Sequence, residues 1–168
     1  LPVYPVRGQI ALVPTSPELS QLNKVLSYGG YVTPAFNGHH CLGASFIPND
    51  EDTAIRHEDH EHNRQLLNQF VPALGARLPA TDSWRGRASY RTQSRDYLPL
   101  VGALSPTPET EGLYLSLGHG SKGFCYAPLA AEILAARLNG EPYPVPSRVL
   151  ASLDPDRFRQ RGLRRAQP

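Results

Sequence analysis

The feature that most constrains the fold of this chain is a glycine-rich loop between a strand-like run and a helix-like run. The apolar run GLYLSLG at 112–118 has the length and composition of a strand. The loop GHGSKG follows at 118–123, and then comes an alanine- and leucine-rich segment at 127–140 that ends in Gly140, as helices often do. Such a loop lets the backbone approach an anion or a ring closely. A turn that only allows a helix to pack closely on a sheet would have the same sequence.

Four other features lack support in the sequence. Lys122 is followed by Gly123, where a Walker A motif needs Ser or Thr. The histidine-rich segment at 57–62 has no HExxH spacing, so we expect its acids to face solvent on a helix and predict no metal site. Cys41 and Cys125 are far apart, have no CxxC spacing and predict no disulfide framework. A GxSxG nucleophile motif is also absent.

The composition favours strands and turns within a chain of single-domain size. The chain has 168 residues, 14 glycines and 17 prolines, more of both than an average protein. No run of 18 apolar residues occurs, and the start LPVYPVRGQI has no basic region followed by an apolar one. We therefore expect a cytoplasmic protein without membrane contact.

The first half of the chain predicts a sheet of mostly antiparallel strands. A strand is expected at 4–13, and a hairpin is expected where Asn37-Gly38 joins the strand-like runs at 25–36 and 39–46. Another strand is expected at 82–92.

One amphipathic helix is expected at 53–70, closed by Pro72. Its apolar face is predicted to carry Ile55, His62, Leu66, Leu67 and Phe70. Together these elements predict an α+β fold, with the helix laid on the sheet.

Basic residues gather in two places. Five lie between Arg77 and Arg95, and five arginines stand in the last twelve residues. The tail at 143–168 is expected to be irregular apart from a short helix near 147–153, with its arginines either solvated or in contact with an anion such as RNA phosphate. Arg95 and Asp96 are expected to form a surface ion pair.

Four motifs in register carry a resemblance to a known family. They are PVRGQ (5–9), GYVTPAFNGHHCLGASF (30–46), YRTQSRDYLPLVG (90–102) and GLYLSLGHGSKGFCYAPLAAEILAARLNGEP (112–142). In this order they resemble the C-terminal half of FAD-dependent amine oxidoreductases of the D-amino-acid oxidase and glycine oxidase superfamily. Within it, the chain is most similar to the FAD-dependent C-terminal domain of bifunctional enzymes that modify the wobble uridine of tRNA.

The resemblance implies FAD as cofactor and tRNA as substrate. The implied reaction removes the carboxymethyl group from carboxymethylaminomethyl-(2-thio)uridine and releases glyoxylate. It also implies an upstream dinucleotide-binding half and an N-terminal methyltransferase domain. Without the dinucleotide-binding half, we expect this fragment to hold FAD weakly and to be inactive. The implied parts are a substrate-binding region at 1–111, a flavin-contacting strand-loop-helix at 112–142 and a basic tail at 143–168.

The resemblance also assigns roles to single residues. Tyr31 and Arg91 match the positions that bind the substrate carboxylate, and Phe46 matches a residue lining the pocket. The flavin-contacting residues are implied to be Gly118, Gly120, Ser121, Lys122, Gly123 and Phe124.

Two positions in the loop depart from the family pattern. Lys122 stands where close relatives have an arginine, which keeps the positive charge but loses the planar fork. Ser121 stands where simple glycine oxidases have a second arginine, which counts against a free amino acid as substrate. Two alternatives stay open: an FAD-dependent oxidase of small amines or amino acids, and a non-catalytic basic RNA-binding module.

Overall fold

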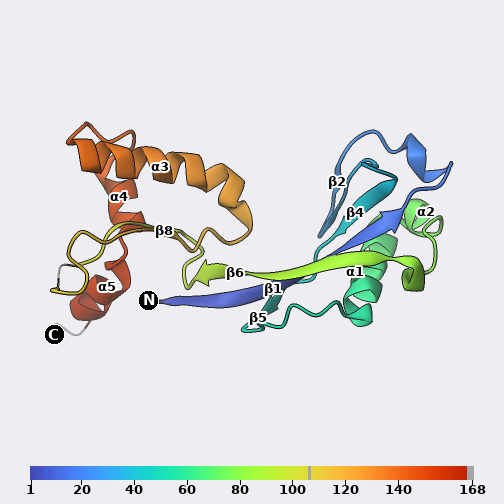
Figure 1. Cartoon of the computed structure of the whole chain (residues 1–168), viewed down its shortest axis with the longest axis horizontal. Coiled ribbons are helices and arrows are strands. Elements are labelled where there is room, and N and C mark those ends of the chain that lie inside the picture. The colour runs from blue at the N-terminus through green and yellow to red at the C-terminus, as the bar shows by residue number, and fades with distance from the viewer. Residues whose placement is uncertain (106, 166–168) are drawn as a thin grey trace. The chain divides into compact units, whose positions relative to one another are not determined.

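A computed structural model describes residues 1–105 and 107–165 of the chain, and it confirms the α+β class (Figure 1). The chain divides into two compact units: Val6–Tyr90, and Leu1–Pro5 together with the residues from Arg91 onward. The parts predicted at 1–111, 112–142 and 143–168 are functional divisions, which packing alone does not test.

The unit Val6–Tyr90 is built on an antiparallel sheet. Its strand order is β2-β3-β4-β1-β5, and β6 also pairs with β1. β1 is paired with β4 so that Ala11 faces Leu42 and Val13 faces His40. The strands are β1 (Val3–Pro14), β2 (Leu26–Ser27), β3 (Tyr31–Val32), β4 (His39–Gly43), β5 (Ile47–Pro48) and β6 (Arg85–Ser94).

The hairpin predicted at Asn37-Gly38 is confirmed. Asn37 and Gly38 have φ values of 48° and 76°, the left-handed pair of a tight two-residue turn. The Phe36 N–H donates to the His39 carbonyl at 2.8 Å across the turn. The run at 25–36 is not one strand, because it turns at 28–30 and forms both β2 and β3.

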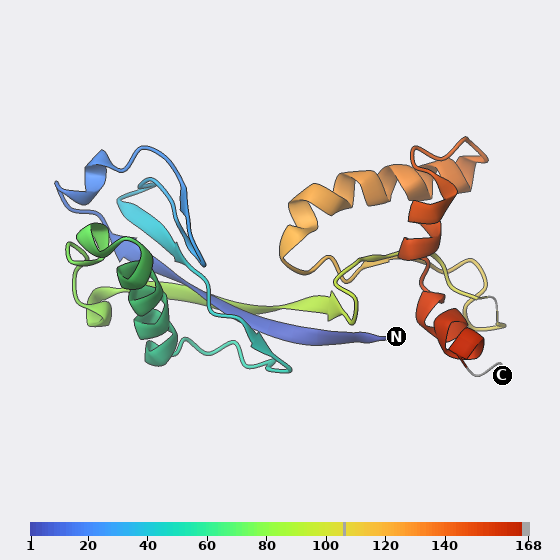
Figure 2. The ribbon, with the colours of Figure 1, turned by 180° about the vertical axis from the view of Figure 1, so that it is seen from behind.

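Helix α1 covers one face of this sheet, behind the strands in Figure 1 and in front of them in Figure 2. It spans His57–Phe70, and the short α2 (Pro72–Gly75) follows it, so the predicted start at residue 53 is wrong. The predicted apolar face is only partly confirmed: Leu67 is buried in the core, but Ile55 and Phe70 are about half exposed. The residues buried along α1 are Asp59, His60, Asn63 and Leu67.

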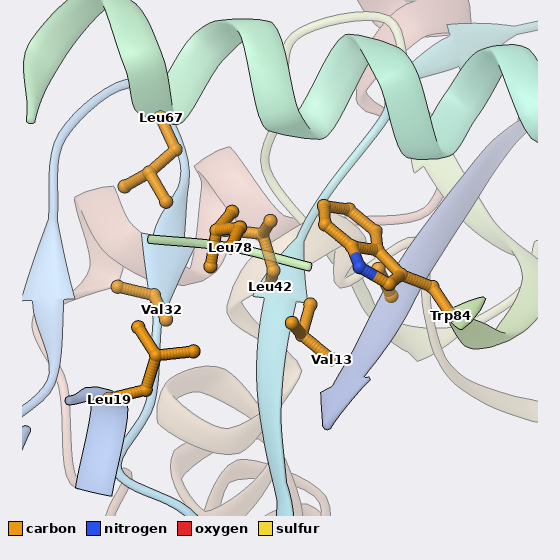
Figure 3. Close-up of a cluster of buried hydrophobic side chains, with 8 residues drawn as sticks. Val13, Leu19, Val32, Leu42, Leu67, Leu78 and Trp84 are labelled. Atoms are coloured by element: carbon orange, nitrogen blue, oxygen red, sulfur yellow. The ribbon is translucent and has the colours of Figure 1, made fainter. Parts of the chain in front are cut away.

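Two layers hold α1 to the sheet, and the first is apolar. Its members come from the strands, from α1, from the 3-10 helix at Leu19–Gln21 and from the two sides of the 3-10 helix at Thr81–Ser83 (Figure 3). Burial of such side chains contributes about 25 cal/mol per Å² of apolar surface. The buried members are Ala11, Val13, Leu19, Val32, Leu42, Leu67, Leu78 and Trp84.

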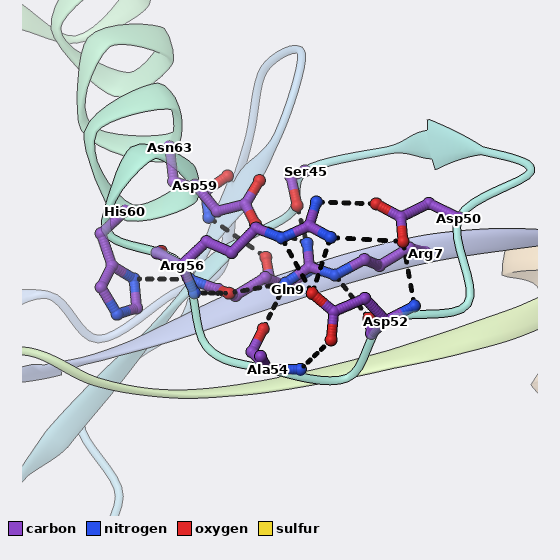
Figure 4. Close-up of polar contacts among 10 residues, drawn as sticks. All are labelled: Arg7, Gln9, Ser45, Asp50, Asp52, Ala54, Arg56, Asp59, His60 and Asn63. Carbon is purple, nitrogen blue, oxygen red and sulfur yellow. Dashed lines mark hydrogen bonds and ion pairs between the residues drawn. The ribbon is translucent and has the colours of Figure 1, made fainter.

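The second layer is polar and surrounds two side chains of β1 (Figure 4). Arg7 is fully buried, and its Nη1 lies 2.5 Å from Asp59 Oδ2. Its remaining donors reach the carbonyls of Asp52 and Ala54. Gln9 donates to the Arg56 carbonyl at 2.7 Å and accepts from the Arg56 N–H. The acid Asp59 therefore does not face solvent as predicted, because it neutralises a buried guanidinium.

The other unit has its own sheet and core. β7 (Leu100–Ala103) pairs with β8 (Tyr114–Leu117), and α3 (Gly123–Asn139) and α4 (Ser147–Leu153) pack against β7 around Val101, Ala130 and Ile133. Helix α3 ends as predicted at Gly140, whose φ is 70°. A short 3-10 helix at Gly120–Lys122 precedes α3.

The tail is more ordered than the sequence predicts. Helix α4 is confirmed, but a further helix, α5 (Arg157–Arg165), follows it. Arg157 is 2% exposed and binds Asp96 with both Nε and Nη2, at 3.0 and 2.7 Å. Asp96 thus has a partner other than the predicted Arg95. The side chains of Arg161, Arg164 and Arg165 lie outside the described residues.

Candidate functional site

The predicted site residues fall in both compact units. Tyr31 lies on β3 and Phe46 just after β4, both within Val6–Tyr90. Arg91 on β6 and the glycine-rich loop at 118–123 belong to the other unit. Convergence of these residues in one pocket therefore stays a prediction.

Tyr31 lies on the face of the sheet opposite the apolar core. Val32 next to it is buried with Leu42 in the core, whereas Tyr31 is paired with Gly43, and the neighbouring position of β1 on that side is Ile10. Side chains alternate between faces along a strand, so Tyr31, Gly43 and Ile10 share one face. We call this the Tyr31 face.

Gly43 makes room for the tyrosine ring. A Cβ atom on Gly43 would lie 2.9 Å from Ile10 Cγ2, closer than real Cβ contacts, and 3.0 Å from Tyr31 Oη, tighter than most of them. The Tyr31 side chain also hydrogen-bonds Cys41. Burial raises the pKa of the Cys41 thiol, and this hydrogen bond partly opposes the rise. The phenol is thus held in place by its own sheet. Phe46 is half exposed.

Within the other unit, the end of β6 lies against the glycine-rich loop. Gln93 forms an isolated bridge with His119, and Ser94 lies within 3.8 Å of the place a Cβ on Gly118 would occupy. Arg91 is two positions before Gln93 on the same strand, and its side chain is half buried. The structure therefore brings the strand that carries Arg91 to the loop.

The loop needs its glycines for conformation and for close packing. Gly118 and Gly120 have φ values of 74° and 56°, which other residues rarely adopt. A Cβ on Gly120 would lie 2.6 Å from Gln93 Oε1. The close-packing explanation thus holds for Gly120. Close packing does not explain the residues on the outer side of the loop. Ser121 and Lys122 are exposed there, and Phe124 is fully exposed.

Helix α3 begins four residues earlier than predicted, so Gly123 and Phe124 form its first turn. No side-chain cap serves its N-terminus, whose first N–H groups have no partner within the helix. The helix dipole adds partial positive charge to that of Lys122. An exposed aromatic ring, a cation and free donors suit a planar ring with anionic character. The loop is therefore suited to hold a planar, negatively charged ring.

Sequence reasoning missed Gln93, His119 and Cys41. His119 Nε2 lies 3.1 Å from Ser116 Oγ, while its Nδ1 is buried without a hydrogen-bond partner among the described residues. This nitrogen is therefore a polar atom beside the loop that is available to a bound group. In the sequence, the only signal for His119 is its position inside the motif GHGSKG. Across residues 1–105 and 107–165, no three metal-ligating side chains converge.

The comparisons with known proteins agree with this geometry. The family model "FAD dependent oxidoreductase" (DAO) matches residues 1–137. The chain belongs to this family. Its cofactor is FAD, and the loop, Lys122 and the start of α3 are the residues that fit it. No helix in the described part of the chain is long and apolar enough to span a membrane.

Three curated relatives are similar along nearly the whole chain. The tRNA 5-methylaminomethyl-2-thiouridine biosynthesis bifunctional proteins MnmC of Chromobacterium violaceum and Methylobacillus flagellatus are each 40% identical over 97% and 98% of this chain. That of Aeromonas hydrophila is 38% identical over 100%. The chain spans 28% of the length of each relative.

Solved structures share the fold. Glycine oxidase from Geobacillus kaustophilus has a TM-score of 0.72 and 23% identity over 92% of this chain and 39% of its own. L-proline dehydrogenase from P. horikoshii has a TM-score of 0.67 and 22% identity over 96% and 41%. At this level of identity the likeness concerns the fold alone.

Proposed function

We propose that this chain is the substrate-binding and flavin-contacting part of an FAD-dependent oxidoreductase acting on the wobble uridine of tRNA. The proposed substrate is the carboxymethylaminomethyl group, an N-substituted glycine. The observation that carries the proposal is the similarity of nearly the whole chain to three proteins named for the biosynthesis of 5-methylaminomethyl-2-thiouridine in tRNA. The upstream dinucleotide-binding half and the methyltransferase domain belong to the same proposal.

The proposed reaction breaks one C–H and one C–N bond. A hydride leaves the carbon between the amine and the carboxylate, and the resulting imine takes up water. Hydrolysis then gives glyoxylate and an aminomethyl group on the uridine. FAD, when bound, supplies the hydride acceptor.

The residues of this chain orient the substrate and stabilise charge. Tyr31 and Arg91 would bind the substrate carboxylate, for which the arginine fork is suited. Phe46 would line the pocket. Lys122 and the α3 N-terminus would stabilise negative charge at the edge of the flavin, with Gly118, Gly120, Ser121, Gly123 and Phe124 forming the surface it lies on.

The first experiment measures glyoxylate release from tRNA that carries the carboxymethylaminomethyl group, using the full FAD-loaded protein. Tyr31→Phe and Arg91→Ala are expected to lower kcat/KM by at least about tenfold, as loss of one charge-assisted hydrogen bond does. Tyr90→Phe, at an exposed ring, is the matched control. Full activity in both site variants would contradict the assigned roles.

A second candidate is a small-molecule amine or amino-acid oxidase, which the fold of glycine oxidase favours. Ser121, in place of a second arginine, argues against it. Sarcosine turnover as efficient as that of modified tRNA would establish this alternative. The wobble-uridine proposal would then be wrong.

A further inference from the structure

The exposed edge of the sheet in Val6–Tyr90 carries arginines that no structural contact explains. Arg85 and Arg87 lie on β6, which runs beside β1 in Figure 1 and pairs with it. Both side chains are exposed. Within residues 1–105 and 107–165, neither guanidinium has a hydrogen-bond or ion-pair partner. The acid nearest in sequence, Asp82, lies 3.6 Å from His57 Nδ1 instead. Packing therefore does not account for the two positive charges.

Both arginines project from the face of the sheet that carries Tyr31. Gly86 between them points toward α1, because a Cβ there would lie 2.7 Å from His60 Cε1. Side chains alternate along a strand, so Arg85 and Arg87 point to the other side. That side is the Tyr31 face, defined above by Ile10 and Gly43.

The distance from the two arginines to Tyr31 suits one nucleic-acid strand that contacts both. Gly86 lies beside the Ile10 carbonyl, and Ile10, Gly43 and Tyr31 follow one another across β1, β4 and β3. Three strand spacings separate β6 from β3, about 14 Å. Residues two apart on a strand are about 7 Å apart, which suits consecutive phosphates of a nucleic-acid strand.

We propose that Arg85 and Arg87 bind the sugar-phosphate backbone of tRNA next to the nucleotide whose base reaches Tyr31. This rests on the proposed function for the identity of the RNA. The exposed Ser89 hydroxyl and the unpaired N–H groups at the outer edge of β6 provide further phosphate donors. In this proposal the arginines contact phosphates and no base edges, so they bind the backbone irrespective of the RNA sequence.

The test is binding of an unmodified tRNA transcript to the full FAD-loaded protein over a series of salt concentrations. The variant is the double substitution Arg85→Gln/Arg87→Gln. The control is Lys24→Gln/Arg148→Gln, which removes the same charge at two other exposed positions. Loss of two phosphate contacts should weaken binding about tenfold and lower the slope of log K against log salt by about 1.4. The KM for modified tRNA should rise while kcat stays unchanged.

Wild-type affinity and salt slope in the arginine variant would overturn the proposal, and so would an equal loss in the control. Competition by polyglutamate as strong as that by tRNA would assign the edge to an acidic protein and also overturn it. Glyoxylate release from tRNA that carries the carboxymethylaminomethyl group tests the proposed reaction separately. A wild-type protein that releases none, yet binds tRNA through the two arginines, would refute the reaction and not the RNA surface.

Discussion

At the residue scale, the environment of Tyr31 depends on Gly43, which has no Cβ atom. Gly43 pairs with Tyr31 across β3 and β4, and a Cβ there would crowd the ring and the Ile10 side chain. The sequence motif around Tyr31 indicates a role for the phenol by resemblance. The need for glycine opposite it follows only from the pairing register.

Gly43→Ala is expected to lower stability by about 1–3 kcal/mol, the usual cost of overpacking. It should also displace the Tyr31 ring and raise KM for the substrate. Gly29→Ala is the matched control, because a Cβ there would make only ordinary contacts, the shortest 3.5 Å. Urea unfolding and steady-state kinetics measure both effects. Unchanged kinetics in Gly43→Ala would show that the ring does not depend on this space.

At the element scale, the buried side chain of Arg157 anchors α5. Arg157 binds Asp96 and donates to the carbonyls of Leu98 and Pro99, which lie between β6 and β7. The sequence predicts a solvated arginine-rich tail, because the neighbouring residues in the chain do not distinguish Arg157 from Arg159. Burial separates them: Arg157 is 2% exposed, and the Arg159 side chain is 64% exposed.

Arg157→Gln is expected to destabilise the protein by about 3 kcal/mol, because it removes the positive charge that neutralises the partly buried Asp96. Arg159→Gln should change stability by less than about 0.5 kcal/mol. Chemical unfolding followed by circular dichroism compares the two. Equal stability of both variants would show that α5 is not anchored by the Asp96 contact.

At the scale of the whole molecule, buried polar groups connect stability to pH. Burial lowers the pKa of His60 from 6.5, and the nearby His57 adds to this effect. His60 is 3% exposed and packs between Gln9 and Trp84. The folded protein therefore favours the neutral ring more than the unfolded chain does.

We expect the free energy of unfolding to fall as the pH drops below 6.5, because the unfolded chain then binds a proton that the folded protein resists. The loss continues until the pH passes the lowered pKa of the folded state. His60→Gln should lack this pH dependence, whereas His62→Gln, at an exposed position, should keep it. Unfolding midpoints measured from pH 8 to 5 test this, and a slope kept by His60→Gln would assign it to another group.

The sequence by itself determined what depends on neighbours in the chain. The turn at Asn37-Gly38, the end of α3 at Gly140 and the order of strand, glycine loop and helix follow from backbone preferences a few residues long. The family motifs added the cofactor, which the match over residues 1–137 supports.

Only the tertiary structure decided which polar residues are buried. Asp59 is buried on α1 because Arg7, 52 positions away, needs its charge, and Arg157 is buried because Asp96, 61 positions away, faces it. Hydrophobic periodicity and composition cannot show such partners, because a single charged residue in a helical segment is predicted to face solvent. The contacts of Gly43 with Tyr31 and of Gly120 with Gln93 have the same origin. Each depends on a register that forms only when distant segments pair.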